Sequence, residues 1–356
     1  MDKQTKFHYM KRIDEKLSDL PWYVTEYIDS RKRKLSHTTL LNYTHDFIIF
    51  FDWMVMDCFV ADHRKNVSLD ALEKLTVRDI ENFLTYLEYQ TGNSRITINR
   101  KISALKSLFD YLQNKAETTD LKPYLLRNVM AKVELNSIKE SQETVANRIG
   151  GTLLRDDDFD SFREFVSHGY GQKYKDNKRM HRFHQHNRER DTAIISLILG
   201  SGLRLSEVAG CNLEDLDLKN NLIRVTRKGN KEQFVYFSDQ AFIDIMEYIK
   251  IREARYKPGK SETFLFLPAD VGRKGKSRRF TQRSIEKIVE KYAKSYGKPT
   301  LSVHTLRHSF ATRYHKENND VPKLRNQLGH SSIQTTMIYT HLTNDEMKEA
   351  INRMDN

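Results

Sequence analysis

Apolar residues that recur every three to four positions dominate the first 135 residues, and this periodicity is the strongest constraint on the fold. After a capping-type start at Ser36, the first clear run contains Leu40, Leu41, Tyr43, Phe47, Ile48, Phe50, Phe51 and Met54. Further runs of the same kind open at Thr76 and Thr97. Helices with one apolar side bury that side against one another. Residues 1–135 are therefore predicted to form a helical domain.

The second half of the chain combines helical periodicity with a single signal for antiparallel strands. A buried helix is expected over 191–199, ended by the glycines around Gly202. Residues 222–226 and 233–237 alternate between apolar and polar on either side of Lys228-Gly229-Asn230, which predicts a hairpin. The predicted fold class is mainly α with a small antiparallel β-sheet (α+β).

Changes in local composition suggest where the domains begin and end. Residues 136–152 have little periodicity and contain Gly150-Gly151, so they are predicted to be a linker before a second domain at 153–343. In the tail, 344–356, one helical face would carry Met347, Ala350, Ile351 and Met354. That face would contact another protomer or pack on its own domain.

The net charge favours a polyanionic partner, with nucleic acid as the first candidate, although a merely soluble basic protein is the alternative. The 356 residues carry a formal charge of +12. Cys58 and Cys211 are too far apart in sequence to suggest a metal site or a disulfide framework. The polar start and the absence of a long apolar run predict no signal peptide, no membrane span and a cytoplasmic location.

The segment 169–190 is rich in Lys, Arg and His and is interpreted as a flexible basic loop near DNA. Its histidines, His181, His184 and His186, lack the cysteine or carboxylate ligands that would complete a zinc site. The chain also lacks a Gly-x-x-x-x-Gly-Lys phosphate loop. No metal and no nucleotide cofactor is therefore expected.

Two arginines are the best candidates for binding a phosphodiester. Guanidinium groups match the nonbridging oxygens with paired donors and stay charged. Arg204 follows a Gly-Leu bend after the buried helix, and Glu207 three residues later could orient it or cap a local helix. Arg307 lies three residues after His304, so one side of a helix would present both.

Further chemistry is predicted for His304, His330, Tyr339 and a lysine of the hairpin. The histidines could donate to a phosphoryl oxygen or accept a proton, whereas a tyrosine nucleophile needs cationic neighbours or a base. Lys228 at the hairpin tip could protonate a leaving oxygen; Lys231 is its rival, and either could simply contact phosphate. A basic side of the helix that opens near Thr97 could track DNA phosphates or be a solvated face; it carries Arg95, Arg100, Lys101 and Lys106.

Taken together, the order and spacing of Arg204, Lys228, His304, Arg307, His330 and Tyr339 resemble the signature of the tyrosine recombinases, also called the phage-integrase family. The resemblance rests on 201–207, on 304–312, and on 328–332 through 339–341, and it is closest to the Xer type. It implies a helical core-binding domain followed by a catalytic domain. It also implies that Tyr339 attacks the scissile phosphate, leaving a 3′-phosphotyrosine and a free 5′-hydroxyl.

The same resemblance implies roles for the other site residues and for partners. Arg204 and Arg307 would hold the nonbridging oxygens with help from His330, Lys228 would be the general acid, and His304 a base or donor. The partners would be double-stranded DNA, three further copies of the chain in a tetramer on two sites, and a DNA translocase regulator. Chromosome-dimer resolution is the leading prediction; a mobile-element integrase, a tyrosine-class topoisomerase and a non-catalytic DNA-binding protein are the alternatives.

Overall fold

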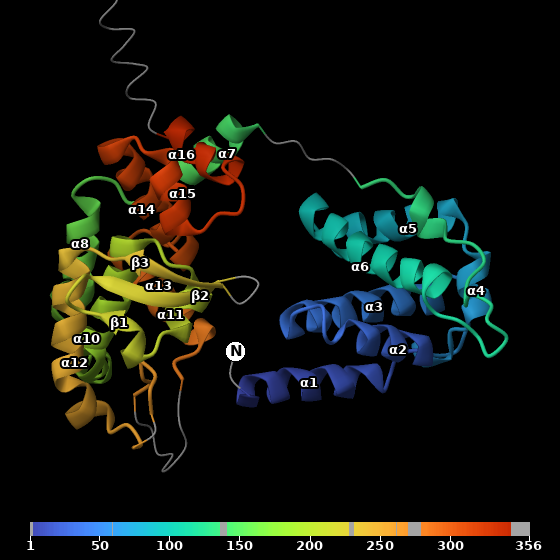
Figure 1. Cartoon of the computed structure of the whole chain (residues 1–356), viewed down its shortest axis with the longest axis horizontal. Helices are drawn as coiled ribbons and strands as arrows, with labels where there is room; N and C mark the ends of the chain where they lie inside the picture. Colours follow the sequence, from blue (N-terminus) through green and yellow to red (C-terminus); the bar gives the residue numbers. More distant parts are fainter. Residues whose placement is uncertain are drawn as a thin grey trace, which may run out of the picture. The chain divides into compact units, whose positions relative to one another are not determined.

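The computed structural model describes residues 3–58, 60–135, 141–227, 231–260, 262–269 and 279–342. The chain divides into two units, Met1–Lys139 and Glu140–Asn356. The described part is mainly helical and contains one three-stranded antiparallel sheet, which confirms the predicted fold class (Figure 1). Residues 228–230 and the tail 343–356 lie outside the described residues, so the predictions made for Lys228 and for the tail helix are not addressed by the geometry.

The described residues of the first unit form helices joined by loops, with no strand beyond an isolated bridge between Glu117 and Pro123. Its α-helices are α1 (Lys3–Leu17), α2 (Trp22–Arg31), α3 (His37–Asp57), α4 (Leu69–Lys74), α5 (Val77–Thr85) and α6 (Arg95–Asn114). Short 3-10 or π turns occupy Arg64–Asn66, Tyr86–Gln90 and Val129–Lys132.

Helix starts and core of the first unit follow the sequence pattern. The Ser36 side chain accepts from the Thr39 backbone N–H, and Thr76 forms a reciprocal capping box with Asp79. The apolar stripes meet in an aromatic core, in which Phe50 contacts the rings of Phe83 and Phe109. Each such ring stabilises the fold by roughly 1.5–3 kcal/mol through burial alone.

The second unit surrounds one long buried helix with helices and the small sheet. Its α-helices are α7 (Gln142–Gly150), α8 (Asp158–Glu164), α9 (Tyr170–Lys173), α10 (Lys178–Ser201), α11 (Leu205–Gly210), α12 (Asp239–Tyr256), α13 (Gln282–Tyr296), α14 (Val303–Asn318), α15 (Val321–Leu328) and α16 (Gln334–Leu342). Single turns lie at Phe165–Gly169 and Leu213–Asp215, and the strands are β1 (Leu216–Asp217), β2 (Leu222–Arg227) and β3 (Lys231–Tyr236), in the order β1-β2-β3.

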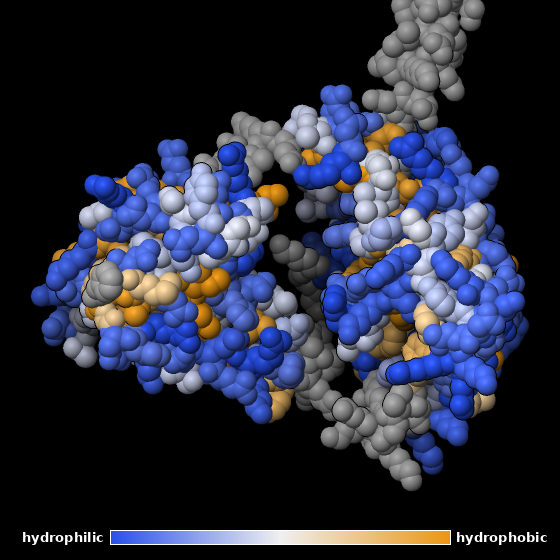
Figure 2. Space-filling view, turned by 180° about the vertical axis from the view of Figure 1, so that it is seen from behind, coloured by the Kyte–Doolittle hydropathy of each residue, from blue (hydrophilic) through white to orange (hydrophobic). Residues whose placement is uncertain are grey.

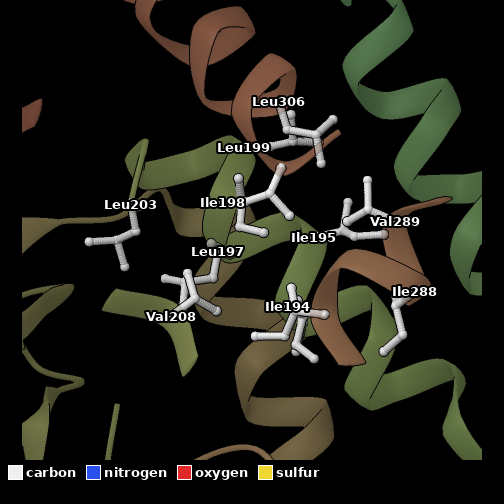
Figure 3. Packing of buried hydrophobic residues seen from close by; sticks show 14 of the residues in the cluster. Ile194, Ile195, Leu197, Ile198, Leu199, Leu203, Val208, Ile288, Val289 and Leu306 are labelled. Carbon is white, nitrogen blue, oxygen red and sulfur yellow. The ribbon is translucent and has the colours of Figure 1, made fainter. Parts of the chain in front are cut away.

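The middle of α10 is buried on every side, which explains its uninterrupted apolar sequence. All residues of 191–199 are buried. Figure 3 shows Ile194, Ile195 and Ile198 packed among side chains from α13 and α14, including Val289 and Leu306. The helix ends at Ser201, where Gly202 adopts a left-handed conformation, as the glycines there predicted. The visible faces of both units are mostly hydrophilic (Figure 2).

Two expectations about local structure were wrong. The segment 169–190 is not a flexible loop: it continues from a π turn through α9 into the first half of α10, and His184 is fully buried there. The proposed linker also contains helix α7, which packs on α16 within the second unit (Figure 1). In both places the burial of scattered apolar residues outweighs a polar local sequence, because tertiary packing supplies most helix stability.

Candidate functional site

Arg307 joins the ends of two helices that are far apart in the sequence. From α14, its Nη1 donates to the carbonyl of Gly202 at 2.5 Å and its Nη2 to the carbonyl of Leu328 at 2.8 Å. These carbonyls belong to the C-terminal ends of α10 and α15, where the helix dipoles are negative. These carbonyls compensate the positive charge of the guanidinium, although Arg307 is only 4 % exposed. Burial lowers the pKa of Arg307 to about 10, so it stays protonated at neutral pH.

Arg204 lies beside Arg307 and is oriented by a buried carboxylate. Glu207 accepts from the Arg204 backbone N–H at 2.9 Å and from its Nη1 at 2.9 Å, while Nη2 donates to the carbonyl of Gly329 at 2.9 Å. Glu207 thus both caps α11 and fixes the arginine, the two roles suggested for it. The Arg204 side chain is one-third exposed, which leaves part of its guanidinium accessible to an anion.

His330 follows the left-handed Gly329 that ends α15, as expected from the sequence, and it contacts Arg307. Its Nε2 lies 3.1 Å from Nη2 of Arg307, and its Nδ1 lies 3.0 Å from Oγ1 of Thr336. Because a guanidinium only donates, Nε2 accepts and Nδ1 carries the proton. Burial, reinforced by the nearby arginines, lowers the pKa of His330 to about 4, so the ring is neutral.

Tyr339 brings a phenol to the same place from α16. Its ring stacks on that of His330, with centroids 6.5 Å apart, and its hydroxyl lies 2.9 Å from Nδ1 of His308. Tyr339 is 2 % exposed. Burial raises its pKa to about 12, opposed by the positive charges of Arg307 and Arg204. The phenol therefore lies within electrostatic reach of both guanidinium groups but is protonated at neutral pH.

His304 lies at the start of α14, one turn before His308, and its side chain is exposed. The two imidazole centroids are 5.9 Å apart. The C-terminal ends of α10 and α15, the first turns of α14, and α16 thus bring together Arg204, His304, Arg307, His330 and Tyr339. Of the two hairpin lysines, Lys231 opens β3 as an exposed residue paired in register with Arg227, and Lys228 is outside the described residues.

Two neighbours of the site were missed in the sequence. His308 was quoted only as part of a motif, although its position four residues after His304 places it on the same side of α14. Arg227 is buried beneath the site: Nη2 donates to the carbonyl of Gln327 at 2.7 Å, and Nε lies 3.6 Å from Oε1 of Glu207. Strand alternation could have revealed it, because Arg227 falls on the same side of β2 as the buried Ile223 and Val225.

Gly329 allows Arg227 to take this position. Gly329 has φ +62°, and a Cβ there would lie 1.3 Å from Nη1 of Arg227. We expect Gly329→Ala to lower the free energy of unfolding by roughly 2–4 kcal/mol, from left-handed strain together with overpacking. Denaturant unfolding measures this.

Gly297→Ala is the matched control, because Gly297 lies in the same unit with φ +97° and has nothing within 4 Å of the position that a Cβ would occupy. Its free energy of unfolding should fall only by the part that is due to backbone strain. Arg227→Ala should recover much of the Gly329→Ala defect in the double variant; simple addition of the two losses would contradict the clash.

The basic side assigned to α6 is only partly exposed. Arg95 and Arg100 are exposed and Lys106 is half-buried, but Lys101 is buried and lies 3.3 Å from Oδ1 of the buried Asp46. Arg100 also pairs with Asp46, through Nη2 at 2.8 Å. Lys101 therefore faces the core of the first unit and not the basic side, because Asp46 needs compensation for its burial.

The three histidines of 169–190 serve the helical packing. His184 Nε2 lies 2.8 Å from the carbonyl of Val166, His181 Nδ1 lies 3.0 Å from that of Gly171, and the ring centroid of His186 lies 5.6 Å from that of Tyr256. No group of three or more potential His, Cys, Asp or Glu ligands occurs among the residues that the structure describes. Over the same residues, no helix is both long and apolar enough to cross a membrane.

The sequence that forms these two units matches a known family of DNA-processing enzymes. The phage integrase family model matches residues 174–346, and the phage integrase N-terminal SAM-like domain matches residues 25–116. The chain belongs to the phage integrase family, the tyrosine recombinases, which cleave and rejoin DNA strands without metal or ATP.

Its similar relatives are recombinases of the Xer type. The chain is 37 % identical to tyrosine recombinase XerS of Streptococcus gordonii, over 97 % of this chain and 98 % of that one. It is 39 % identical to XerS of Lactococcus lactis subsp. cremoris, with the same coverage. Among solved structures, XerH bound to a palindromic difH substrate has a TM-score of 0.62 at 22 % identity, covering 90 % of this chain and 80 % of that one. The Tn1549 transposon integrase in complex with transposon right end DNA has a TM-score of 0.61 at 19 % identity, covering 94 % and 98 %.

Proposed function

We propose that Tyr339 is the nucleophile of a site-specific recombination reaction on double-stranded DNA. The observation that carries this is the position of its ring, which stacks on that of His330, while Nε2 of His330 lies 3.1 Å from Nη2 of Arg307. The Tyr339 oxygen bonds to phosphorus, and the bond from phosphorus to the 5′-oxygen breaks. A 3′-phosphotyrosine and a 5′-hydroxyl result, and the reverse reaction rejoins a strand.

The remaining residues divide the work around the phosphate. Arg204 and Arg307 hold the nonbridging oxygens, where negative charge grows in the transition state. His330 is kept neutral mainly by burial, and Arg307 and Thr336 orient its ring. It assists the two arginines in holding the phosphate. Lys228 protonates the leaving 5′-oxygen, and His304 acts as a hydrogen-bond donor or base at the exposed edge of the site.

The biological reaction that we propose is resolution of chromosome dimers at a dif-like site in the cytoplasm. Support comes from the XerS relatives, which match over nearly their whole lengths, and from the likeness of fold to XerH bound to its difH substrate. Four protomers act on two sites, under the control of a DNA translocase. A mobile-element integrase is the alternative, favoured by the likeness of fold to the Tn1549 integrase; the location of the gene inside a mobile element would favour it.

A nicked suicide DNA substrate tests the proposed reaction. Cleavage releases a short 5′-hydroxyl fragment and traps the protein on the 3′ end, and peptide mapping should find the attached nucleotide on Tyr339. Sequencing the trapped DNA identifies the site, and the mass of the complex gives the number of protomers. Binding without any covalent adduct would support an architectural protein, and relaxation of plasmids that lack the recovered site would support a topoisomerase.

The basic residues of α6 that are fully or partly exposed provide a separate test of DNA binding. We propose that Arg95, Arg100 and Lys106 contact phosphates, as does Lys231 in the second unit. Arg95→Ala should weaken binding to all DNA sequences and reduce the slope of log affinity against log salt by about 1. Lys101→Ala is the control, because its buried ammonium compensates Asp46: it should lower stability and leave the salt slope of the folded protein unchanged. Equal salt slopes for Arg95→Ala and the unmodified protein would remove Arg95 from the interface.

A further inference from the structure

His308 makes a direct contact with the oxygen that reacts. Its Nδ1 lies 2.9 Å from the hydroxyl oxygen of Tyr339, and the two ring centroids are 5.8 Å apart. His304, on the same helix, has its centroid 5.9 Å from that of His308. With Tyr339 only 2 % exposed, bulk water has little access to the phenol proton. A side chain that already contacts the phenol is therefore well placed to receive it.

The other imidazole beside Tyr339 is already committed. His330 accepts from Arg307 at Nε2, and its Nδ1 proton is directed to Thr336. Neither nitrogen of His330 is therefore free to take a proton from the phenol. His308 differs, because its Nδ1 faces the phenol itself.

The protonation states fit a donating phenol and an accepting imidazole. Burial, together with His304 and Arg307, lowers the pKa of His308 to about 4, so the ring is neutral at pH 7. Burial raises the pKa of Tyr339 to about 12, so the phenol keeps its proton. A neutral imidazole has one nitrogen without hydrogen; in the tautomer that carries its hydrogen on Nε2, Nδ1 accepts from the phenol at 2.9 Å.

We propose that His308 is a catalytic residue that receives the Tyr339 proton during strand cleavage, which leaves His304 as the hydrogen-bond donor. The proposal rests on the proposed function of Tyr339. As the tyrosine oxygen bonds to phosphorus, its O–H bond breaks and the proton moves to Nδ1 of His308. The bond from phosphorus to the 5′-oxygen breaks at the same time, and that oxygen takes a proton from Lys228. In ligation the proton on His308 returns to the departing tyrosine.

Bound DNA makes this transfer feasible. In the free protein, burial and the positive charge of Arg307, which lies beside Arg204, oppose a positive charge on His308. A phosphodiester held by those arginines supplies negative charge, which favours the imidazolium. The tyrosine is thereby kept protonated until a phosphate arrives, and it is activated only in the complex that it cleaves.

His308→Asn tests the proposal, because an asparagine oxygen can replace Nδ1 as hydrogen-bond acceptor but cannot take a proton at neutral pH. We expect its cleavage of the suicide substrate, at saturating DNA, to be about 10²-fold slower. A fluorinated tyrosine at position 339, whose phenol ionises more easily, should recover about tenfold or more of this rate. DNA with a bridging 5′-sulfur, whose leaving group needs no proton, should not recover it.

His315→Asn is the matched control, since His315 is a buried histidine on the same helix outside the site. Once bound to DNA it should cleave at the unmodified rate. His308→Asn cleaving within twofold of the unmodified rate would overturn the proposal, as would rescue by the 5′-sulfur substrate and not by the fluorinated tyrosine. If asparagine prevents folding, His308→Gln is judged by the same criteria. If the unmodified protein forms no adduct, the proposed function itself fails.

Discussion

Tyr339→Phe is expected to bind DNA and yet form no covalent adduct with it. Phenylalanine keeps the ring that stacks on His330 and lacks only the oxygen that would bond to phosphorus. The loss of the contact with His308 should lower the free energy of unfolding by only about 1 kcal/mol. Denaturing gel electrophoresis on the suicide substrate measures the adduct, and titration of labelled DNA measures binding.

Tyr314→Phe is the control for that experiment. Tyr314 packs against the same small apolar cluster as Tyr339, but it lies about two turns beyond Arg307 along α14. It should form adduct at the unmodified rate. An adduct that persisted in Tyr339→Phe would mean that another side chain is the nucleophile, and the cluster around Arg204 and Arg307 would then be a phosphate-binding site only.

Arg307→Ala is expected to cause the second-largest loss, in both rate and stability. Removing a preorganised donor from a developing negative charge costs about 10²–10³ in rate, and Arg307 also orients His330, so we expect about 10³ or more. The carbonyls of Gly202 and Leu328 lose their donor as well, which should lower the free energy of unfolding by about 2 kcal/mol or more. Single-turnover cleavage and denaturant unfolding measure the two effects.

Arg313→Ala is the control that separates the loss of Arg307 from the loss of any arginine on α14. Arg313 is on the same helix, but it is half-exposed and pairs with Glu317. Arg313→Ala should retain its stability, because surface ion pairs contribute little to it. It should also cleave at close to the unmodified rate. Arg307→Lys should restore charge but not the paired donors, and should remain slow. Full activity of Arg307→Lys would show that a point charge is sufficient at this position.

The sequence predicted which residues the fold brings together better than it predicted the local structure around them. Arg204, His304, Arg307, His330 and Tyr339 could be chosen because they occur in an order and spacing that resembled a family, and the glycines at 202 and 329 marked helix ends correctly. The polar segments 142–150 and 169–190 misled, since their few apolar residues acquire helical structure only by packing on α16 and on the core of the second unit. The exposure of Lys101 was also mispredicted. This lysine lies next to exposed arginines in the sequence, but it is buried because it pairs with the buried Asp46.

The sequence by itself determined the helix starts at Ser36 and Thr76, the alternation of the hairpin, and the residue types available for phosphate chemistry. These depend on side chains within a few positions of one another. Only the tertiary structure decided that Arg307 bridges Gly202 and Leu328, that Arg227 lies beneath Gly329, and that His308 meets Tyr339. Such contacts join separate helices, and their burial sets the protonation of the histidines and of the phenol. Desolvation by surrounding chain is a property of the packed fold, which no local pattern of residues contains.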